Sequence, residues 1–160
     1  ETPLHGAASL GEPGVAAVLI DHGANIEAVA TYPGIPHGTP LDFAVHFGMV
    51  EVVDLLIQRG AKVLSARMAA GAGQLALVQS EIEDLQQNTE RLLDAFRCAV
   101  VCGRMQVVEY LLVSGLDVKA DPTRQDRKHK LSPHGWAKHR LKEVGPRWGH
   151  DQVMRILASR

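Results

Sequence analysis

Apolar and polar positions alternate along this chain in a pattern that is typical of paired short helices. A Thr-Pro pair comes first, followed by an apolar stripe, a glycine, a second apolar stripe and a closing glycine. In the first stretch these features are Thr2-Pro3, Leu4 with Ala7-Ala8, Gly11, Val15 with Leu19-Ile20, and Gly23. The spacing predicts one helix that ends at Gly11 and a second helix that ends at Gly23.

The same pattern returns along the chain. Copies begin at residues 2, 39, 64, 94 and 132, an average step of 32.5 residues. The copies at 64 and 132 are more divergent than the others. Each unit has an apolar face that a single helix pair cannot cover, so we expect neighbouring units to stack and bury a continuous core.

Individual residues in the pattern have physical roles. Threonine before the first turn can accept hydrogen bonds from free helix amides, and proline fits the first helical position. Small alanines let the partner helix approach closely. Glycines end the first helices, where a left-handed backbone is expected; they are Gly11, Gly48, Gly73 and Gly103.

The repeat resembles the ankyrin repeat, whose period is about 33 residues and whose signature is T-P-L-H-x-A. The resemblance rests on Thr2-Pro3-Leu4-His5 and on Thr39-Pro40-Leu41-Asp42, and it spans nearly the whole chain. It implies a single all-α domain over residues 1–160, an ankyrin-like helix–turn–helix solenoid with short hairpin or loop fingers. The expected repeats are about 2–38, 39–63, 64–88, 89–120 and 131–160. The first copy starts abruptly at Thr2. Since solenoid ends normally carry a polar cap, this abrupt start is expected if an earlier segment is cut away or disordered.

Several stretches depart from the family pattern. Ala30–Gly38 predicts an enlarged loop, and the finger after Lys62 is nearly absent. Gln74–Leu93 predicts an extended second helix, with Asn88 or Thr89 capping the next helix. Residues 121–130 predict a flexible basic loop. About eight extra residues around 141–146 separate the helices of the last copy.

Composition supports a helical core and narrows the class of protein. The chain is 46% hydrophobic but only 4% aromatic, which suits closely packed helices better than a β-sandwich. No apolar run approaches the roughly 18 residues that a membrane span needs, and no signal peptide is visible. Cys98 and Cys102 lie on one helix face and are expected to be buried thiols of a reducing, cytoplasmic protein, the alternative being a redox or metal pair.

The near-neutral net charge hides an asymmetry between the two ends. Residues 1–118 carry 6 Lys or Arg against 14 Asp or Glu, a net charge of −8, whereas residues 119–160 carry 11 against 4, a net charge of +7. Such blocks can attract oppositely charged partners. A solvated basic surface is the simpler interpretation.

The ankyrin resemblance implies non-catalytic binding of a protein partner through a concave groove. The two residues before each first glycine are expected to face this groove, together with residues of the long finger. The predicted partner-binding residues are Ser9, Leu10, Tyr32, Ile35, His37, His46, Phe47, Val101 and Cys102. Tyr32 and Phe47 are the expected anchors, since aromatic residues dominate binding hot spots; packing under the long loop is the alternative.

Two signature positions are expected to be structural. In the family the histidine at the position of His5 bonds to the neighbouring hairpin, and His134 is the nearest later equivalent, one residue out of register. Asp42 replaces that histidine in the second copy, where it can act as a local acceptor.

Metal, cofactor and enzyme signatures are missing from the sequence. His129, His134 and His139 lie five residues apart, a spacing that does not align them on one helix face. No zinc-protease, phosphate-loop or nucleophile-elbow motif occurs. We therefore expect no metal, no cofactor, no small-molecule substrate and no enzymatic activity. An enzyme whose site is not recognisable in the sequence is a remote alternative.

A second function class rests on the basic end of the chain. Basic residues interleaved with Trp136 and Trp148 can grip phosphates and stack bases, although Trp136 also fits a core position. The basic patch predicted for nucleic acid or an acidic surface comprises Arg124, Arg127, Lys128, Lys130, Arg140 and Arg147.

Overall fold

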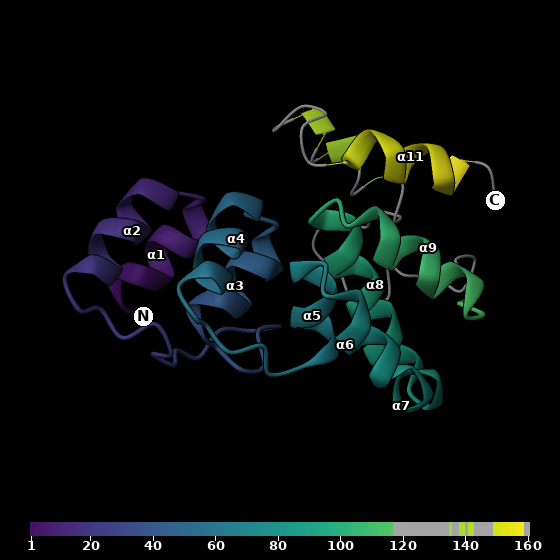
Figure 1. The fold of residues 1–160 in the computed structure, drawn as a ribbon, viewed down its shortest axis with the longest axis horizontal. Helices are drawn as coiled ribbons and strands as arrows, with labels where there is room; N and C mark the ends of the chain where they lie inside the picture. The colour runs from purple at the N-terminus through teal and green to yellow at the C-terminus, as the bar shows by residue number, and fades with distance from the viewer. Residues whose placement is uncertain (117–134, 136–137, 140, 143–148, 159–160) are drawn as a thin grey trace.

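The computed structural model describes residues 1–116, 135, 138–139, 141–142 and 149–158. Over these residues the chain forms a row of antiparallel helix pairs (Figure 1). The helices are α1 (Pro3–Leu10), α2 (Pro13–Asp21), α3 (Pro40–Phe47), α4 (Val50–Gln58), α5 (Ala66–Ala72), α6 (Leu75–Ser80), α7 (Ile82–Gln87), α8 (Thr89–Val101), α9 (Met105–Val113) and α11 (His150–Ala158). Figure 1 shows the pairs α1–α2, α3–α4, α5–α6 and α8–α9 following one another along the long axis.

The helices begin and end as the repeat pattern predicts. Thr39 precedes Pro40 at the start of α3, and its hydroxyl oxygen accepts a hydrogen bond from the Asp42 amide (3.3 Å). Each predicted glycine has a positive φ, in the left-handed region that ends a helix without strain only for glycine. The φ values at Gly11, Gly48, Gly73 and Gly103 are 73°, 69°, 77° and 65°.

Stacking buries two apolar clusters that meet in the middle of the row. One is built on α1, α3 and α4 and reaches Met68 and Cys98. The other is built on α5, α8 and α9 and includes Val153 of α11. No strand occurs among the described residues, where an isolated bridge joins Tyr32 to Ile35. The all-α solenoid expected from the sequence is confirmed.

The stretch 74–93 corrects one expectation, because it is not one extended helix. α6 ends at Ser80, and a separate helix, α7, ends at Gln87. Although this stretch is mostly polar, Ile82 and Leu85 pack against the core. Turning the chain at Glu81 lets Leu85 become buried (1% exposed) against the second cluster.

The helix after this turn starts earlier than in the other repeats. Asn88 caps α8, since its Oδ1 accepts from the Arg91 amide (3.1 Å), as the sequence predicts. α8 therefore begins at Thr89, before the copy of the sequence pattern that starts at residue 94. Between α6 and the pattern copy at residue 94, α7 and the first turn of α8 occupy the place where other repeats have a finger. The predicted repeat boundaries stay a prediction.

The last described helix lies against the fourth pair. α11 packs on α9 and α8, and buried His150 at its start donates from Nε2 to the carbonyl oxygen of Val101 (2.7 Å). No helix in the described part of the chain is both long and apolar enough to cross a membrane.

Candidate protein-binding surface

The long finger between α2 and α3 is fixed at its end by buried Asp42. Oδ2 of Asp42 accepts hydrogen bonds from the amides of His37 (2.9 Å) and Gly38 (3.3 Å). The predicted role of Asp42 as a local acceptor is confirmed. Because this carboxylate belongs to the first turn of α3, the end of the finger and the helix form one unit.

His5 of the first repeat also contacts the end of the finger, at Gly38. Nε2 of His5 lies 2.9 Å from the carbonyl oxygen of Gly38, and Nδ1 lies 3.1 Å from the Thr2 amide. Since a carbonyl can only accept, the proton sits on Nε2, and Nδ1 accepts from Thr2. The structural role predicted for His5 is confirmed.

A buried arginine links three repeats beneath the finger. Arg67 of α5 is 5% exposed; its Nη1 donates to Asp42 Oδ1 (2.8 Å), and its Nε lies 2.8 Å from Asp94 Oδ2 of α8. Nη1 also reaches the Gly34 carbonyl of the finger (3.4 Å). Arg97 pairs with the same Asp94 (2.9 Å). The two guanidinium groups and two carboxylates balance each other in charge.

Aromatic rings from the finger and α3 pack on this support. Tyr32 makes edge contacts with Phe43 (5.6 Å between centroids) and Phe47 (5.9 Å), and His46 contacts Phe47 at 5.0 Å. Phe43 is buried, His46 and Phe47 are half-buried, and Tyr32 is 39% exposed. The cluster therefore has a buried base and an edge that reaches solvent.

Burial and neighbouring charge keep His46 neutral. Burial lowers the pKa of this imidazole to about 4, and the positive charges of Arg97 and Arg67 act in the same direction. Nδ1 of His46 lies 3.3 Å from Arg67 Nη2, where a neutral ring can accept. At neutral pH the aromatic edge therefore carries no charge of its own at this position.

Burial raises the pKa of the Cys98 thiol, outweighing the opposite effect of Arg97 and Arg67. Cys98 and Cys102 are both fully buried and form no disulfide with each other, as predicted. Cys98 lies beneath the aromatic edge, with its Sγ 3.7 Å from Arg67 Nη2. We assign it a packing role.

The structure narrows the predicted partner-binding set. Ile35 (4% exposed), Val101 (8%) and Cys102 (0%) are core residues, so they have no side-chain surface to offer a partner. Cys102 is enclosed because α8 packs against α3, and its Sγ lies 3.7 Å from the Val45 carbonyl. This burial corrects the expectation that these three side chains face an open groove.

The remaining predicted residues stay accessible to differing degrees. Leu10 is 74% exposed, and Ser9 and His37 are half-buried. Together with the aromatic residues they form what we call the finger-edge surface: Ser9, Leu10, Tyr32, His37, His46 and Phe47.

Sequence reasoning missed the arginine-centred network. Arg67 stands alone in a helix of small and apolar residues, Ala66–Ala72. A single charge in such a setting signals a buried ion pair, although its partners Asp42 and Asp94 cannot be identified from local spacing.

Other predicted features fall largely outside the described residues. Arg124, Arg127, Lys128, Lys130, Arg140 and Arg147 lie there, as do His134, Trp136 and Trp148. Of the nearby described residues, Lys138, His139 and Lys142 are exposed. Among the residues with a described placement, no group of three or more His, Cys, Asp or Glu side chains could hold a metal ion.

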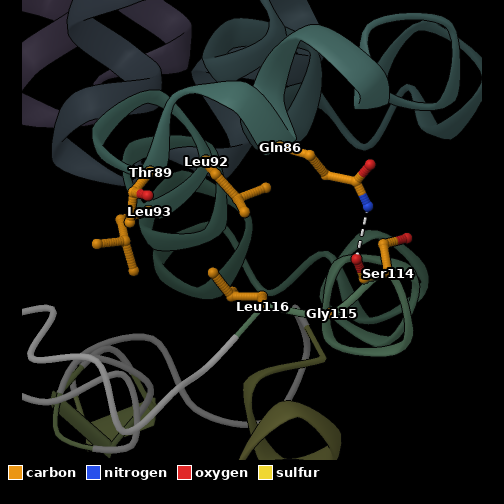
Figure 2. Close-up of a pocket in the computed structure, with 7 residues that line it drawn as sticks. All are labelled: Gln86, Thr89, Leu92, Leu93, Ser114, Gly115 and Leu116. Atoms are coloured by element: carbon orange, nitrogen blue, oxygen red, sulfur yellow. Dashed lines mark hydrogen bonds between the residues drawn. The ribbon is translucent and has the colours of Figure 1, made fainter.

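A pocket of about 470 Å³ lies away from the finger-edge surface, where α7, the start of α8 and the end of α9 meet (Figure 2). Gln86 crosses it to donate to the Ser114 carbonyl (2.7 Å). Its lining residues are Gln86, Thr89, Leu92, Leu93, Ser114, Gly115 and Leu116. None of them is ionisable, so we assign the pocket no acid–base role.

Comparison with known proteins relates the first part of the chain to a family. A family model for ankyrin repeats (3 copies) matches residues 1–67. The crystal structure of the human ASB11 ankyrin repeat domain is similar with a TM-score of 0.45 and 20% sequence identity, over 98% of this chain and 69% of that chain. No curated protein matches the chain.

The family match covers the first two helix pairs and the start of α5, and the same geometry continues beyond it. Gly73 and Gly103 end the later first helices in the same left-handed conformation. Ankyrin repeats generally serve as protein–protein interaction modules, and the family is typically non-catalytic. Residues 1–67 therefore match the ankyrin repeat family, and the rest of the described chain resembles them in its helix pairs.

Proposed function

We propose that this chain is a non-catalytic module that binds a partner protein through its concave groove and long finger. The observation that carries the proposal is the half-exposed aromatic edge of Tyr32, His46 and Phe47. Aromatic side chains on a rigid support are the usual energetic centres of protein interfaces, because they bury a large area with few rotatable bonds.

The support beneath the edge favours binding without large rearrangement. Asp42 fixes the end of the finger, and Arg67 holds Asp42, Asp94 and the Gly34 carbonyl in place. A preorganised surface loses less conformational entropy when a partner docks. Leu10, at the same repeat position as Phe47, extends the apolar surface toward the first repeat.

Affinity capture followed by a binary binding measurement tests this function. The probe variant is Tyr32→Ala, since Tyr32 is 39% exposed; the matched control is Leu77→Ala on α6, whose side chain is 43% exposed. A partner that wild type and Leu77→Ala retain, and that Tyr32→Ala loses, supports the proposal. Equal recovery by all three forms contradicts it.

The alternative function, binding of nucleic acid or an acidic surface by the basic C-terminal third, is supported by the net charge of +7 over residues 119–160. Phosphate contacts make such binding strongly salt-dependent. A gel shift with generic nucleic acid tests it, and absence of a shift at low salt dismisses it.

A further inference from the structure

The part of the chain that carries the finger-edge surface is acidic. Residues 1–116 contain six Lys or Arg against 13 Asp or Glu, a net charge of −7. The first two helix pairs, which end at Gln58, lie within a stretch that has seven Asp or Glu and no Lys or Arg. The carboxylates around the finger-edge surface therefore favour a cationic partner and disfavour an anionic one.

Every arginine of residues 1–116 is paired with a carboxylate. The pairs are Arg59–Asp21, Arg67–Asp42, Arg91–Asp84, Arg97–Asp94 and Arg104–Asp54. The two arginines beneath the finger edge, Arg67 and Arg97, also share Asp94. Because each guanidinium charge is compensated by its own neighbour, these arginines offer little repulsion to a cation that approaches the finger edge.

The rings of the finger edge favour a cation as well. The face of an aromatic ring carries negative charge density and attracts a Lys or Arg head group. Tyr32 is the most accessible of the three rings, at 39% exposed, and its centroid lies 5.9 Å from that of Phe47 at an interplanar angle of 73°. His46 adds no repulsion at neutral pH, because burial lowers the pKa of its imidazole.

An exposed carboxylate borders this surface at the turn between α1 and α2. Glu12 follows Leu10, a member of the finger-edge surface, by two residues. A Cβ added to Gly11 would lie 2.7 Å from Sδ of Met49, so this turn touches the turn that follows Phe47. A basic side chain of a partner that packs on Leu10 and Phe47 would therefore lie near the Glu12 carboxylate.

We propose that the finger-edge surface binds a basic segment of its partner protein, with a Lys or Arg side chain packed on Tyr32 and Phe47. This inference rests on the proposed function and specifies the chemistry of the partner. The long stem of such a side chain buries apolar area against the rings, while its charged head stays near water and carboxylates. An acidic segment meets like charge, and a neutral segment gains nothing from the surrounding carboxylates.

Selection from a displayed library of short random peptides tests the proposal. Wild type, Tyr32→Ala, the ring-preserving Tyr32→Phe and the control Leu77→Ala are panned in parallel, after their helical spectra have been compared. Peptides retained by every form except Tyr32→Ala should be enriched in Lys and Arg relative to the input library. A synthetic copy of such a peptide should bind wild type about threefold or more weakly when salt is raised from about 0.05 M to about 0.5 M.

Charge reversal on the protein gives a second measurement with the same peptide. Glu12 makes no side-chain hydrogen bond to the start of α2, so Glu12→Lys changes the charge without removing a cap. We expect Glu12→Lys to weaken binding by about threefold or more. The matched control is Glu109→Lys on α9, where an equally exposed glutamate lies in the fourth helix pair, and it should bind more tightly than Glu12→Lys.

The outcomes separate this inference from the proposed function. Peptides that need Tyr32 but show no excess of Lys or Arg, or equal binding by Glu12→Lys and Glu109→Lys, overturn the basic partner and leave the proposed function standing. Failure to select any peptide that needs Tyr32 overturns the inference too, and affinity capture of native proteins then decides the proposed function by itself.

Discussion

At the scale of single residues, buried charges decide the geometry of the finger-edge surface. Arg67, Asp42 and Asp94 belong to three different repeats, and each is positioned by the others. A buried ion pair adds little net stability over an apolar substitute, but loss of one member leaves a charge without compensation. These residues are therefore sensitive to single substitution.

Replacing Arg67 should strongly destabilise the fold. Arg67→Met leaves Asp42 and Asp94 facing an apolar side chain, and we expect a loss of about 3–5 kcal/mol in the free energy of unfolding. Denaturant titration measures the change. The control is Arg59→Met, which breaks an exposed pair with Asp21 and should cost no more than about 1 kcal/mol. Equal losses for both variants would contradict the assigned role of Arg67.

His46 should make stability fall in mild acid. In the folded chain its pKa is about 4, against an ordinary value of 6.5, so the unfolded state binds more protons between these values. Stability is therefore fully present above pH 6.5 and decreases as the pH falls toward 4, by about 3 kcal/mol at most. Thermal unfolding at several pH values measures the change.

The comparison for this prediction is His46→Gln, whose side-chain oxygen can still accept from Arg67. Because glutamine does not titrate, the variant should lose less stability than wild type between pH 6.5 and 4. Parallel pH profiles for the two proteins would show that His46 does not cause the decrease.

At the scale of helices, end signals were readable from the sequence, while contacts between helices were not. The Thr-Pro starts, the glycine ends and the cap at Asn88 depend on neighbours within four residues, so local pattern predicts them. The turn at Glu81 depends on Leu85 reaching a core formed by α8, and the burial of Cys102 depends on α3. These are contacts distant in sequence, which spacing alone does not contain.

The cap of α8 should contribute measurably to stability. Asn88→Ala removes the acceptor of the Arg91 amide, and we expect a loss of about 1 kcal/mol in the free energy of unfolding. Asn88→Ser keeps an acceptor and should stay close to wild type. If serine were as costly as alanine, the cap would not be the source of the effect.

At the scale of the whole molecule, the helices along the row differ in how many of their residues are buried. In α2 the only buried residue is Ala16, whereas α8 buries seven residues and packs on α5, α3 and α9. Fold class and the position of the long finger followed from the sequence. The burial of Ile35, Val101 and Cys102 did not, because contacts from distant parts of the chain enclose them.

Hydrogen exchange should follow this difference. We expect the amides of α2 to exchange faster than those of α8, because local opening of α2 breaks fewer buried contacts. Mass spectrometry of peptides from a labelled sample measures the order. Slower exchange in α2 than in α8 would contradict the view that contacts with neighbouring repeats determine how well each helix is protected.

The hydrogen bonds from His37 and Gly38 to Asp42 divide the finger into two parts with different tolerance to change. Thr31–Gly34 are exposed at the tip, whereas Gly38 and Thr39 are locked against the scaffold. Substitutions at the exposed side chains of Thr31 and Pro33 leave the Asp42 hydrogen bonds in place, which makes these two positions natural sites for diversification of this surface by evolution or by library selection.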